Sequence, residues 1–329
     1  MDDMKIIKPK KLSHGDTIAL VAPSGPISDK RFEMLTSKAE VALQSLGFKV
    51  RYGNHIRKSI HQLWAGTIEE RVADLMSVFC DPEISAILAM RGGSVSLEVA
   101  ERLDYQKIKE RIDLHGAPVF MGHSDITVLH QALFKKLGLV TFHGVNGINF
   151  IEELPQYVTD SVIRTVTQVA PSGSILQGGA NMQVLPINTG VVSGRLIGGN
   201  LTSIASIMGT GHEPAVTEPI ILYIEDIDEE PHRINRSLNQ LIACPFFKNV
   251  VGIACGTFID CVYKDNVKFK TTLDDVIREK AKQLNFPIAF GFPFGHSSDN
   301  VTIPNGVSAK LTVNSDFCDL EILEPAVVE

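Results

Sequence analysis

Short apolar runs alternate with amphipathic helical segments along the first half of this chain, from residue 16 to about residue 150. Residues 84–90 (ISAILAM) are apolar at almost every position, which is typical of a strand buried on both faces of a parallel sheet. Residues 17–22 and 119–121 are further apolar runs of strand length, and Thr67 and Glu70 form a capping box that predicts a helix start. The alternation therefore predicts an α/β domain with a parallel sheet.

The second half of the chain has a different pattern. Residues 151–190 contain several Pro and Gly residues and little sustained periodicity, which is typical of a linker. Strand-like runs then return at residues 191–200, 220–224, 250–255, 287–290, 308–313 and 320–323. We expect an N-terminal domain over residues 1–165, a linker over 166–190 and a C-terminal domain over 191–329. The predicted fold class is α/β, with a flavodoxin-like N-terminal domain and a smaller, mixed α/β C-terminal domain that has a β-rich end.

The composition limits the classes of partner. The 329 residues are 44% hydrophobic, which is enough for sizeable cores, and the formal net charge is −7. An acidic chain without a long Lys or Arg run lacks the electrostatic footprint for nucleic acid or anionic membranes, so a small solute is the expected partner. The acidic N-terminal residues do not resemble a secretory signal, and the five scattered cysteines suggest neither disulfides nor a zinc site. We therefore expect a cytoplasmic protein without a metal or a cofactor.

The strongest indication of chemistry is Ser124, at the point where an apolar strand runs through Gly122 into a helix. A tight turn there would lift the serine out of the sheet, and the N–H groups of the following helix would face a developing oxyanion. Gly-x-Ser-Asp before a helix is also ordinary N-capping by Ser124 or Asp125. Ile126 stands where common α/β-hydrolases need a small residue, which argues against that fold.

A nucleophilic serine needs a base and a carboxylate that orients the base. His296 follows the strand at residues 287–290 across a glycine-rich loop, although this pattern also fits an ordinary hydrogen-bonded loop histidine. Glu225 directly follows the strand at residues 220–224 and opens an acidic run, which would otherwise be a solvated face or a Mg²⁺ or Ca²⁺ site. Both residues lie at the carboxyl ends of strands, where ligands bind in open α/β sheets.

Six motifs run along the chain in a fixed order. They are RGG at residues 91–93, GHSDIT at 122–127, TFHG at 141–144, GGNL at 198–201, IED at 224–226 followed by EPHRINR at 230–236, and GH at 295–296. Together they resemble the LD-carboxypeptidases, a family of serine peptidases that includes muramoyltetrapeptide carboxypeptidase and the microcin C self-immunity peptidase. The resemblance covers nearly the whole chain, from about Gly15 to Thr312.

The resemblance implies a catalytic triad of Ser124 as nucleophile, His296 as general base and Glu225 as its orienting partner. It also implies an oxyanion hole made by the backbone N–H groups of Asp125 and of a glycine in the RGG loop, for which we choose Gly93. The expected reaction is removal of the terminal D-alanine from murein tetrapeptides during wall recycling, and relatives of this kind are usually homodimers.

A D-alanine carboxylate needs a cation to bind it. Arg91, Arg233 and Arg236 are the candidates that lie near the motifs, and each could equally form a structural ion pair. The chain also departs from the family where substrate would lie. It has Ser94-Val95 where the family commonly has Tyr-Gly, His123 where the family has Tyr, and His232 and Asn235 where the family has Tyr and Asp.

Three alternatives remain open. One is a microcin-immunity-like hydrolase of peptide–nucleotide amides, but the single tryptophan, Trp64, lies far along the chain from the linker where a nucleobase-stacking residue is expected. Another is a non-catalytic binding protein whose glycine loops at residues 92–93 and 198–199 cradle an anionic ligand. The least favoured is a zinc hydrolase built on His115, His123, His130 and His143, because no metal-ligand spacing such as H-E-x-x-H occurs.

Overall fold

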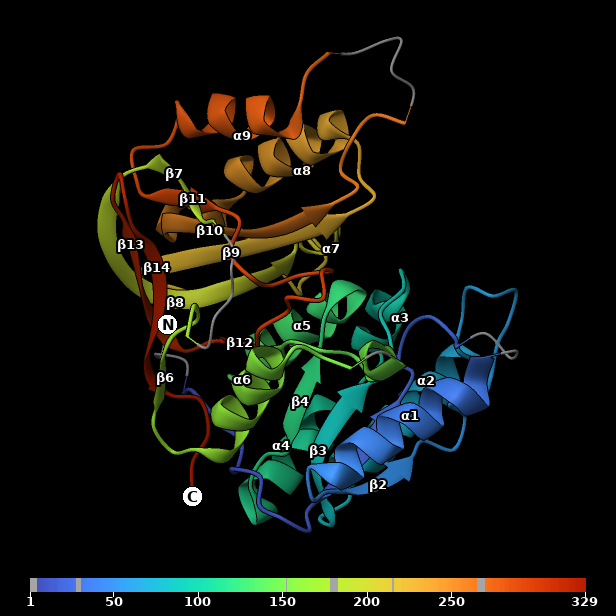
Figure 1. Cartoon of the computed structure of the whole chain (residues 1–329). Coiled ribbons are helices and arrows are strands. Elements are labelled where there is room, and N and C mark those ends of the chain that lie inside the picture. Colours follow the sequence, from blue (N-terminus) through green and yellow to red (C-terminus); the bar gives the residue numbers. More distant parts are fainter. Residues whose placement is uncertain (1–4, 28–30, 152, 178–182, 215, 265–269) are drawn as a thin grey trace.

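The structure is a computed structural model, and it describes residues 5–27, 31–151, 153–177, 183–214, 216–264 and 270–329. Two β-sheets lie side by side, and each is covered by its own helices (Figure 1). Within the described residues no helix is both long and apolar enough to cross a membrane.

The first sheet has the strand order of a flavodoxin-like fold. Five parallel strands are arranged β2-β1-β3-β4-β5, and β12 from the C-terminal half of the chain adds an antiparallel edge next to β5. These strands are β1 (Thr17–Val21), β2 (Lys49–Tyr52), β3 (Ile84–Ala89), β4 (Val119–Gly122), β5 (Thr141–His143) and β12 (Ile303–Asn305). The order confirms the predicted fold class for this half.

Helices cover both faces of the first sheet. Ile18 and Leu20 of β1 pack with α1, whereas Ala19 and Val21 face the opposite side and pack with α2, α4 and α5, because successive strand residues point to opposite faces. The helical segments are α1 (Phe32–Ser45), α2 (Ile68–Cys80), α3 (Ser96–Ala100), α4 (Tyr105–His115), η2 (Ser124–Ile126), α5 (Thr127–Leu137), η3 (Gly147–Ile151) and α6 (Gln156–Thr167).

The second sheet is mixed, with the order β6-β14-β13-β8-β9-β10-β11-β7, and only β8 to β11 run parallel. Its strands are β6 (Pro171–Ser174), β7 (Leu185–Asn188), β8 (Gly190–Asn200), β9 (Ile220–Ile227), β10 (Val250–Ile259), β11 (Ile288–Phe290), β13 (Ser308–Val313) and β14 (Cys318–Pro325). The helical segments are α7 (Leu201–Ser206), α8 (Pro231–Ala243), η4 (Pro245–Asn249) and α9 (Leu273–Ala281). The helices α8 and α9 cover the outer face of β9 to β11 (Figure 1).

Several local predictions can be compared with the structure. The Thr67 capping box is present at the start of α2, and the C-terminal hairpin pairs Leu311 with Leu320. The strand β9 is longer than predicted because pairing with β10 continues to Ile227. The segment expected to be a linker contains β6 and β7, which form the two edges of the second sheet. The predicted cap Ser28 lies outside the described residues.

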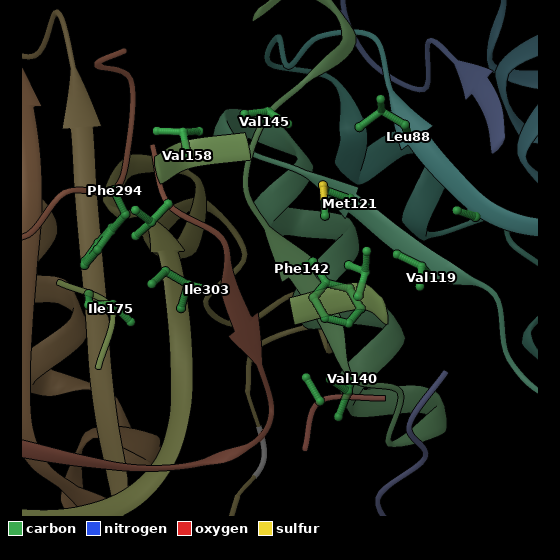
Figure 2. Packing of buried hydrophobic residues seen from close by; sticks show 14 of the residues in the cluster. Leu88, Val119, Met121, Val140, Phe142, Val145, Val158, Ile175, Phe294 and Ile303 are labelled. Carbon is green, nitrogen blue, oxygen red and sulfur yellow. The ribbon is translucent and has the colours of Figure 1, made fainter. Parts of the chain in front are cut away.

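The two halves of the chain share one hydrophobic cluster and a polar seam. Figure 2 shows part of the cluster, with Leu88 and Met121 on the first sheet and Phe294 beside the second. In the seam, the backbone N–H of Asn200 donates to Thr127 Oγ1 over 2.9 Å, and the amide of Gln131 donates to the carbonyl of Gly198 over 2.7 Å. These contacts fix the start of α5 against the end of β8.

The seam leaves no room for a side chain at Gly199. Its φ is +135°, and an added Cβ would lie 2.4 Å from Thr127 Oγ1. We predict that Gly199→Ala lowers the free energy of unfolding by about 3 kcal/mol, because backbone strain and overpacking add. Gly209→Ala is the matched control, because φ is +84° there and nothing lies within 4 Å of the added Cβ. It should cost only about 1 kcal/mol of backbone strain. Urea unfolding measures both free energies of unfolding, and an equal decrease in the two variants would contradict the close contact at Gly199.

Candidate active site

Ser124 lies at a strained turn between β4 and α5. Its φ is +67°, a left-handed conformation that costs a non-glycine residue about 1–2 kcal/mol. Neither Ser124 nor Asp125 caps the helix that follows, because no side-chain cap bond is formed at the start of η2 or of α5. The N-capping interpretation of this sequence is therefore wrong, and the Ser124 side chain is half-buried at the carboxyl edge of the sheet.

The RGG loop packs directly against this turn. An added Cβ on Gly92 would lie 2.5 Å from the Cβ of Ser124, 2.7 Å from its Oγ and 3.1 Å from the backbone nitrogen of Asp125. On Gly93 it would instead lie 2.4 Å from Ser24 Oγ. Only glycines allow this approach, so the loop after β3 and the turn after β4 form one compact unit.

The carboxylate of Asp125 ties this unit together. Its Oδ2 accepts hydrogen bonds from the hydroxyl of Ser24 (2.5 Å) and from the backbone N–H groups of Val95 and Ser96 (2.8 Å each). The side chain is buried, where a carboxylate persists only when it is hydrogen-bonded. The sequence suggested a role for the Asp125 backbone but not for this side chain.

Glu225 and His296 form a buried hydrogen-bonded pair. Nδ1 of His296 lies 2.6 Å from Oε2 of Glu225, whose side chain is 0% exposed, while that of His296 is 12% exposed. Burial alone would lower the pKa of His296, but the charge and the hydrogen bond of Glu225, aided by the charge of Asp226, outweigh it and raise the pKa above the ordinary value. The hydrogen bond through Nδ1 orients the His296 ring and leaves its Nε2 atom without a contact to Glu225.

Two further histidines surround His296. The ring of His123, the residue before Ser124, meets the ring of His296 edge-on at a centroid distance of 4.9 Å, and the His143 ring lies 6.0 Å from that of His123. Burial, together with the charge of His296, lowers the pKa of His123 to about 3, and burial holds the pKa of His143 well below its ordinary value. His296 is therefore the one ring of these three that can be protonated near neutral pH.

Asp226 and Asn300 support the pair, and sequence reasoning missed both. Asp226 accepts from the amide of Asn200 (2.8 Å) and from the hydroxyl of Thr202 (2.7 Å), and it is buried instead of belonging to a solvated acidic run. Asn300 Oδ1 accepts from the backbone N–H of Gly295 (3.0 Å), which fixes the loop that carries His296. Asn200 of the GGNL motif was the available signal for Asp226, because buried carboxylates need such donors.

The predicted carboxylate-binding arginines are all exposed. Arg91 directly precedes Gly92 and donates to the carbonyl of Pro26 over 3.1 Å. Arg233, on the first turn of α8, lies 3.9 Å from Glu229, and Arg236 lies on the same helix. Of these three, Arg91 is placed closest in the chain to the glycine that touches Ser124.

The four histidines of the zinc hypothesis come from four different segments of the chain, although the rings of His123 and His143 are neighbours. His115 ends α4, while His130 lies on α5 with Nε2 2.9 Å from the carbonyl of Gly122. Among the described residues, no three His, Cys, Asp or Glu side chains are grouped so that they could hold a metal ion.

Fold and site together define an α/β protein with a strained serine turn and a carboxylate-bound histidine at the junction of two sheets. Residues 18–144 match the LD-carboxypeptidase N-terminal domain, and residues 193–311 match the LD-carboxypeptidase C-terminal domain. The chain belongs to the LD-carboxypeptidase family.

Relatives match over nearly their full length. The probable murein peptide carboxypeptidase of Bacillus subtilis is 32% identical, over 92% of this chain and 91% of the relative. The murein tetrapeptide carboxypeptidase of Pseudomonas aeruginosa is 30% identical, over 90% and 93%. A solved structure of MccF in complex with glutamyl sulfamoyl guanosine superposes with a TM-score of 0.83 at 26% identity, covering 98% of this chain and 100% of that one.

The pairing of His296 with Glu225 generates a titration prediction. In Glu225→Gln the opposing effect of burial is no longer outweighed, so we expect the pKa of His296 to fall from above to below the ordinary histidine value. NMR titration of the His296 imidazole signals measures this pKa. Asp228→Asn is the control, because Asp228 is exposed and paired with Lys264. An unchanged pKa in Glu225→Gln would show that Glu225 does not hold the proton on His296.

The same pair has a consequence for stability. Because the folded-state pKa of His296 is raised, its ionic contribution is fully present below the ordinary histidine pKa and is lost as pH rises through the raised value.

Proposed function

We propose that this protein is a serine carboxypeptidase that hydrolyses an L,D-peptide bond and releases the terminal D-alanine of murein tetrapeptides. The observation that carries the proposal is the Glu225–His296 pair, whose ring packs on the residue next to the strained Ser124. The names of the relatives support the substrate class. In this proposal Ser124, His296 and Glu225 form the catalytic triad.

The reaction begins with proton transfer from Ser124 Oγ to His296 Nε2 as Oγ attacks the carbonyl carbon before D-alanine. Glu225 stabilises the imidazolium that forms and keeps the ring oriented. The tetrahedral intermediate then collapses, the C–N bond breaks, and His296 gives its proton to the amine of the leaving D-alanine. Water, deprotonated by the same histidine, hydrolyses the acyl-enzyme and restores Ser124.

The oxyanion is bound by the backbone N–H groups of Asp125 and Gly93. The carbonyl of Gly92 accepts a hydrogen bond from Gly25 over 3.0 Å. Because a trans peptide places C=O and N–H on opposite sides, the N–H of Gly93 points away from Gly25 and is free to face the substrate. The contact of Gly92 with Ser124 and with Asp125 N supports this arrangement.

The nucleophile is tested with Ser124→Ala. We predict a loss of about 10³-fold or more in kcat on a murein tetrapeptide, with an unchanged unfolding transition, because only binding and the oxyanion hole remain. Ser45→Ala, on the exposed side of α1, is the control. Mass spectrometry of released D-alanine measures the rate. A fluorophosphonate should label wild type and Ser45→Ala but not Ser124→Ala. Absence of labelling in wild type would favour the non-catalytic binding protein.

A carboxypeptidase must also bind a free terminal carboxylate, for which Arg91 or Arg233 is the proposed partner. Amidation of the D-alanine removes a charge-assisted contact, and we expect it to lower kcat/KM by about tenfold or more. The rates on the acid and the amide are compared by chromatography. Equal kcat/KM values on the acid and the amide would show that the protein does not bind the terminal carboxylate.

The second candidate is a microcin-immunity-like hydrolase. The likeness to MccF, solved with glutamyl sulfamoyl guanosine, favours it. Faster cleavage of an aminoacyl sulfamoyl nucleoside than of the tetrapeptide would establish this alternative.

The proposed setting is wall recycling in the cytoplasm by a homodimer. Analytical ultracentrifugation tests the oligomeric state, and a monomer at micromolar concentration would remove that part of the proposal.

A further inference from the structure

The side chain of Arg71, on α2, is completely buried, with an exposed fraction of 0%. Its Nη2 lies 2.5 Å from a carboxylate oxygen of Glu98, and Trp64 Nε1 donates to the other oxygen of Glu98 over 3.4 Å. A charge is costly to bury unless it is paired and hydrogen-bonded, so a buried guanidinium has to be matched closely by its surroundings. The reaction steps proposed above do not use this ion pair.

The other arm of the guanidinium contacts the two loops that meet at Gly93. Arg71 Nη1 donates to the carbonyl of Val95 over 3.1 Å and to the carbonyl of Pro23 over 3.4 Å. Val95 lies two residues after Gly93, and Pro23 directly precedes Ser24, whose Oγ would lie 2.4 Å from a Cβ added to Gly93. One side chain therefore fixes the loop after β1 and the loop after β3 relative to each other.

The peptide unit between Val95 and Ser96 is held by a charge on each side. Its C=O accepts from Arg71 Nη1, and its N–H, on Ser96, donates to Asp125 Oδ2 over 2.8 Å. Because the peptide is planar, these two bonds determine its orientation, and hydrogen bonds in such a chain strengthen one another. Through this peptide Arg71 is connected to Asp125, whose backbone N–H is one of the two proposed oxyanion donors.

The apolar face of α2 is packed independently of these contacts. Leu75 and Phe79 of the same helix are 0% exposed and belong to the core of the first sheet, and the Thr67 capping box begins the helix. The hydrogen bonds of Arg71 instead join α2 to the loops that carry Ser24 and Val95.

We propose that Arg71 is a positioning residue for the oxyanion hole, because it fixes Gly93 and Asp125 at the spacing that a developing oxyanion requires. The inference rests on the proposed function, since the oxyanion forms only when Ser124 attacks a carbonyl. Oxyanion donors act over about 2.7–3.1 Å, and a misplacement of about 1 Å can lower a rate about 100-fold. Lysine would restore the charge but not the planar fork that holds three acceptors in fixed directions.

The experiment measures D-alanine release from a murein tetrapeptide by Arg71→Lys. We expect kcat to fall about 30-fold while KM stays within about threefold, because the oxyanion donors act in the transition state and not in substrate binding. The pKa of His296, measured by NMR, should equal that of wild type, because none of the hydrogen bonds of Arg71 among the described residues reaches the Glu225–His296 pair. A general loss of structure would instead change KM and this pKa together with kcat.

Glu98→Gln is the second variant, because it weakens the hold on Arg71 without removing a buried group. The Glu98 side chain is 37% exposed, and the amide oxygen of glutamine can still accept from Arg71. We expect the wild-type unfolding transition in urea, a kcat lower by about fivefold and an unchanged KM. If Arg71→Lys does not fold, Glu98→Gln decides the question.

Arg102→Gln is the matched control, because Arg102 is an exposed arginine that pairs with Glu69 of α2 over 3.0 Å without reaching either loop. It should leave kcat and KM unchanged. Wild-type kcat in the folded variants of Arg71 and Glu98, or a loss confined to KM, would overturn the positioning role and leave the proposed function intact. A wild-type protein that releases no D-alanine would overturn the proposed function and this inference with it.

Discussion

The site depends on the contact between the two sheets. Ser124 follows β4 of the first sheet, Glu225 lies on β9 of the second, and His296 lies in the loop that runs from β11 of the second sheet to β12 of the first. The three side chains can therefore approach one another only if the two sheets are fixed relative to each other. The hydrogen bond from Asn200 N to Thr127 Oγ1 helps to fix the two sheets relative to each other. Thr127 begins the helix after Ser124, and the Asn200 side chain donates to Asp226, the residue next to Glu225. A short buried polar seam therefore connects the turn at Ser124 with the strand that carries Glu225.

A second set of buried polar contacts shapes the first half of the site. Asp125 Oδ2 accepts three hydrogen bonds, two of them from backbone N–H groups just beyond the RGG loop. A buried carboxylate with this many donors is rigid, because losing any one contact leaves a charge poorly compensated in a low-dielectric interior. The strain at Ser124 is thus maintained by the surrounding structure, and the loop and the turn cannot move independently.

The sequence predicted the parts of this structure that follow from local patterns. The parallel strands, the Thr67 capping box and the C-terminal hairpin each have a short-range signal, and the structure contains them. The placement of β12 beside β5 had no such signal, because a three-residue strand that crosses to another sheet is fixed by tertiary pairing alone. The same reason explains why β6 and β7 were expected to be linker: edge strands rich in Pro and Gly lack periodicity.

The residues of the candidate site divide in the same way between local and long-range signals. Glu225 and His296 were placed at strand ends by pattern and paired by family resemblance, and the structure brings them within 2.6 Å. The buried roles of the Asp125 carboxylate and of Asp226 could not be read from sequence, because each depends on donors that are distant in the chain: Val95 for one and Asn200 for the other. Composition suggests that an acidic run is solvated, but it cannot show which carboxylate accepts hydrogen bonds from buried donors.

His123 shows how this chain accommodates a departure from its family. The family commonly has tyrosine there, and a charged imidazolium beside His296 would oppose protonation of the His296 ring. Burial keeps His123 neutral, and its Nδ1 lies 2.8 Å from the carbonyl of Gly144, which makes Nδ1–H the donor. A neutral imidazole in this tautomer is an aromatic ring with one hydrogen-bond donor, as a tyrosine side chain is. His123 therefore makes an aromatic contact with His296 without adding a competing charge, so His296 is the ring of this pair whose pKa lies above the ordinary value.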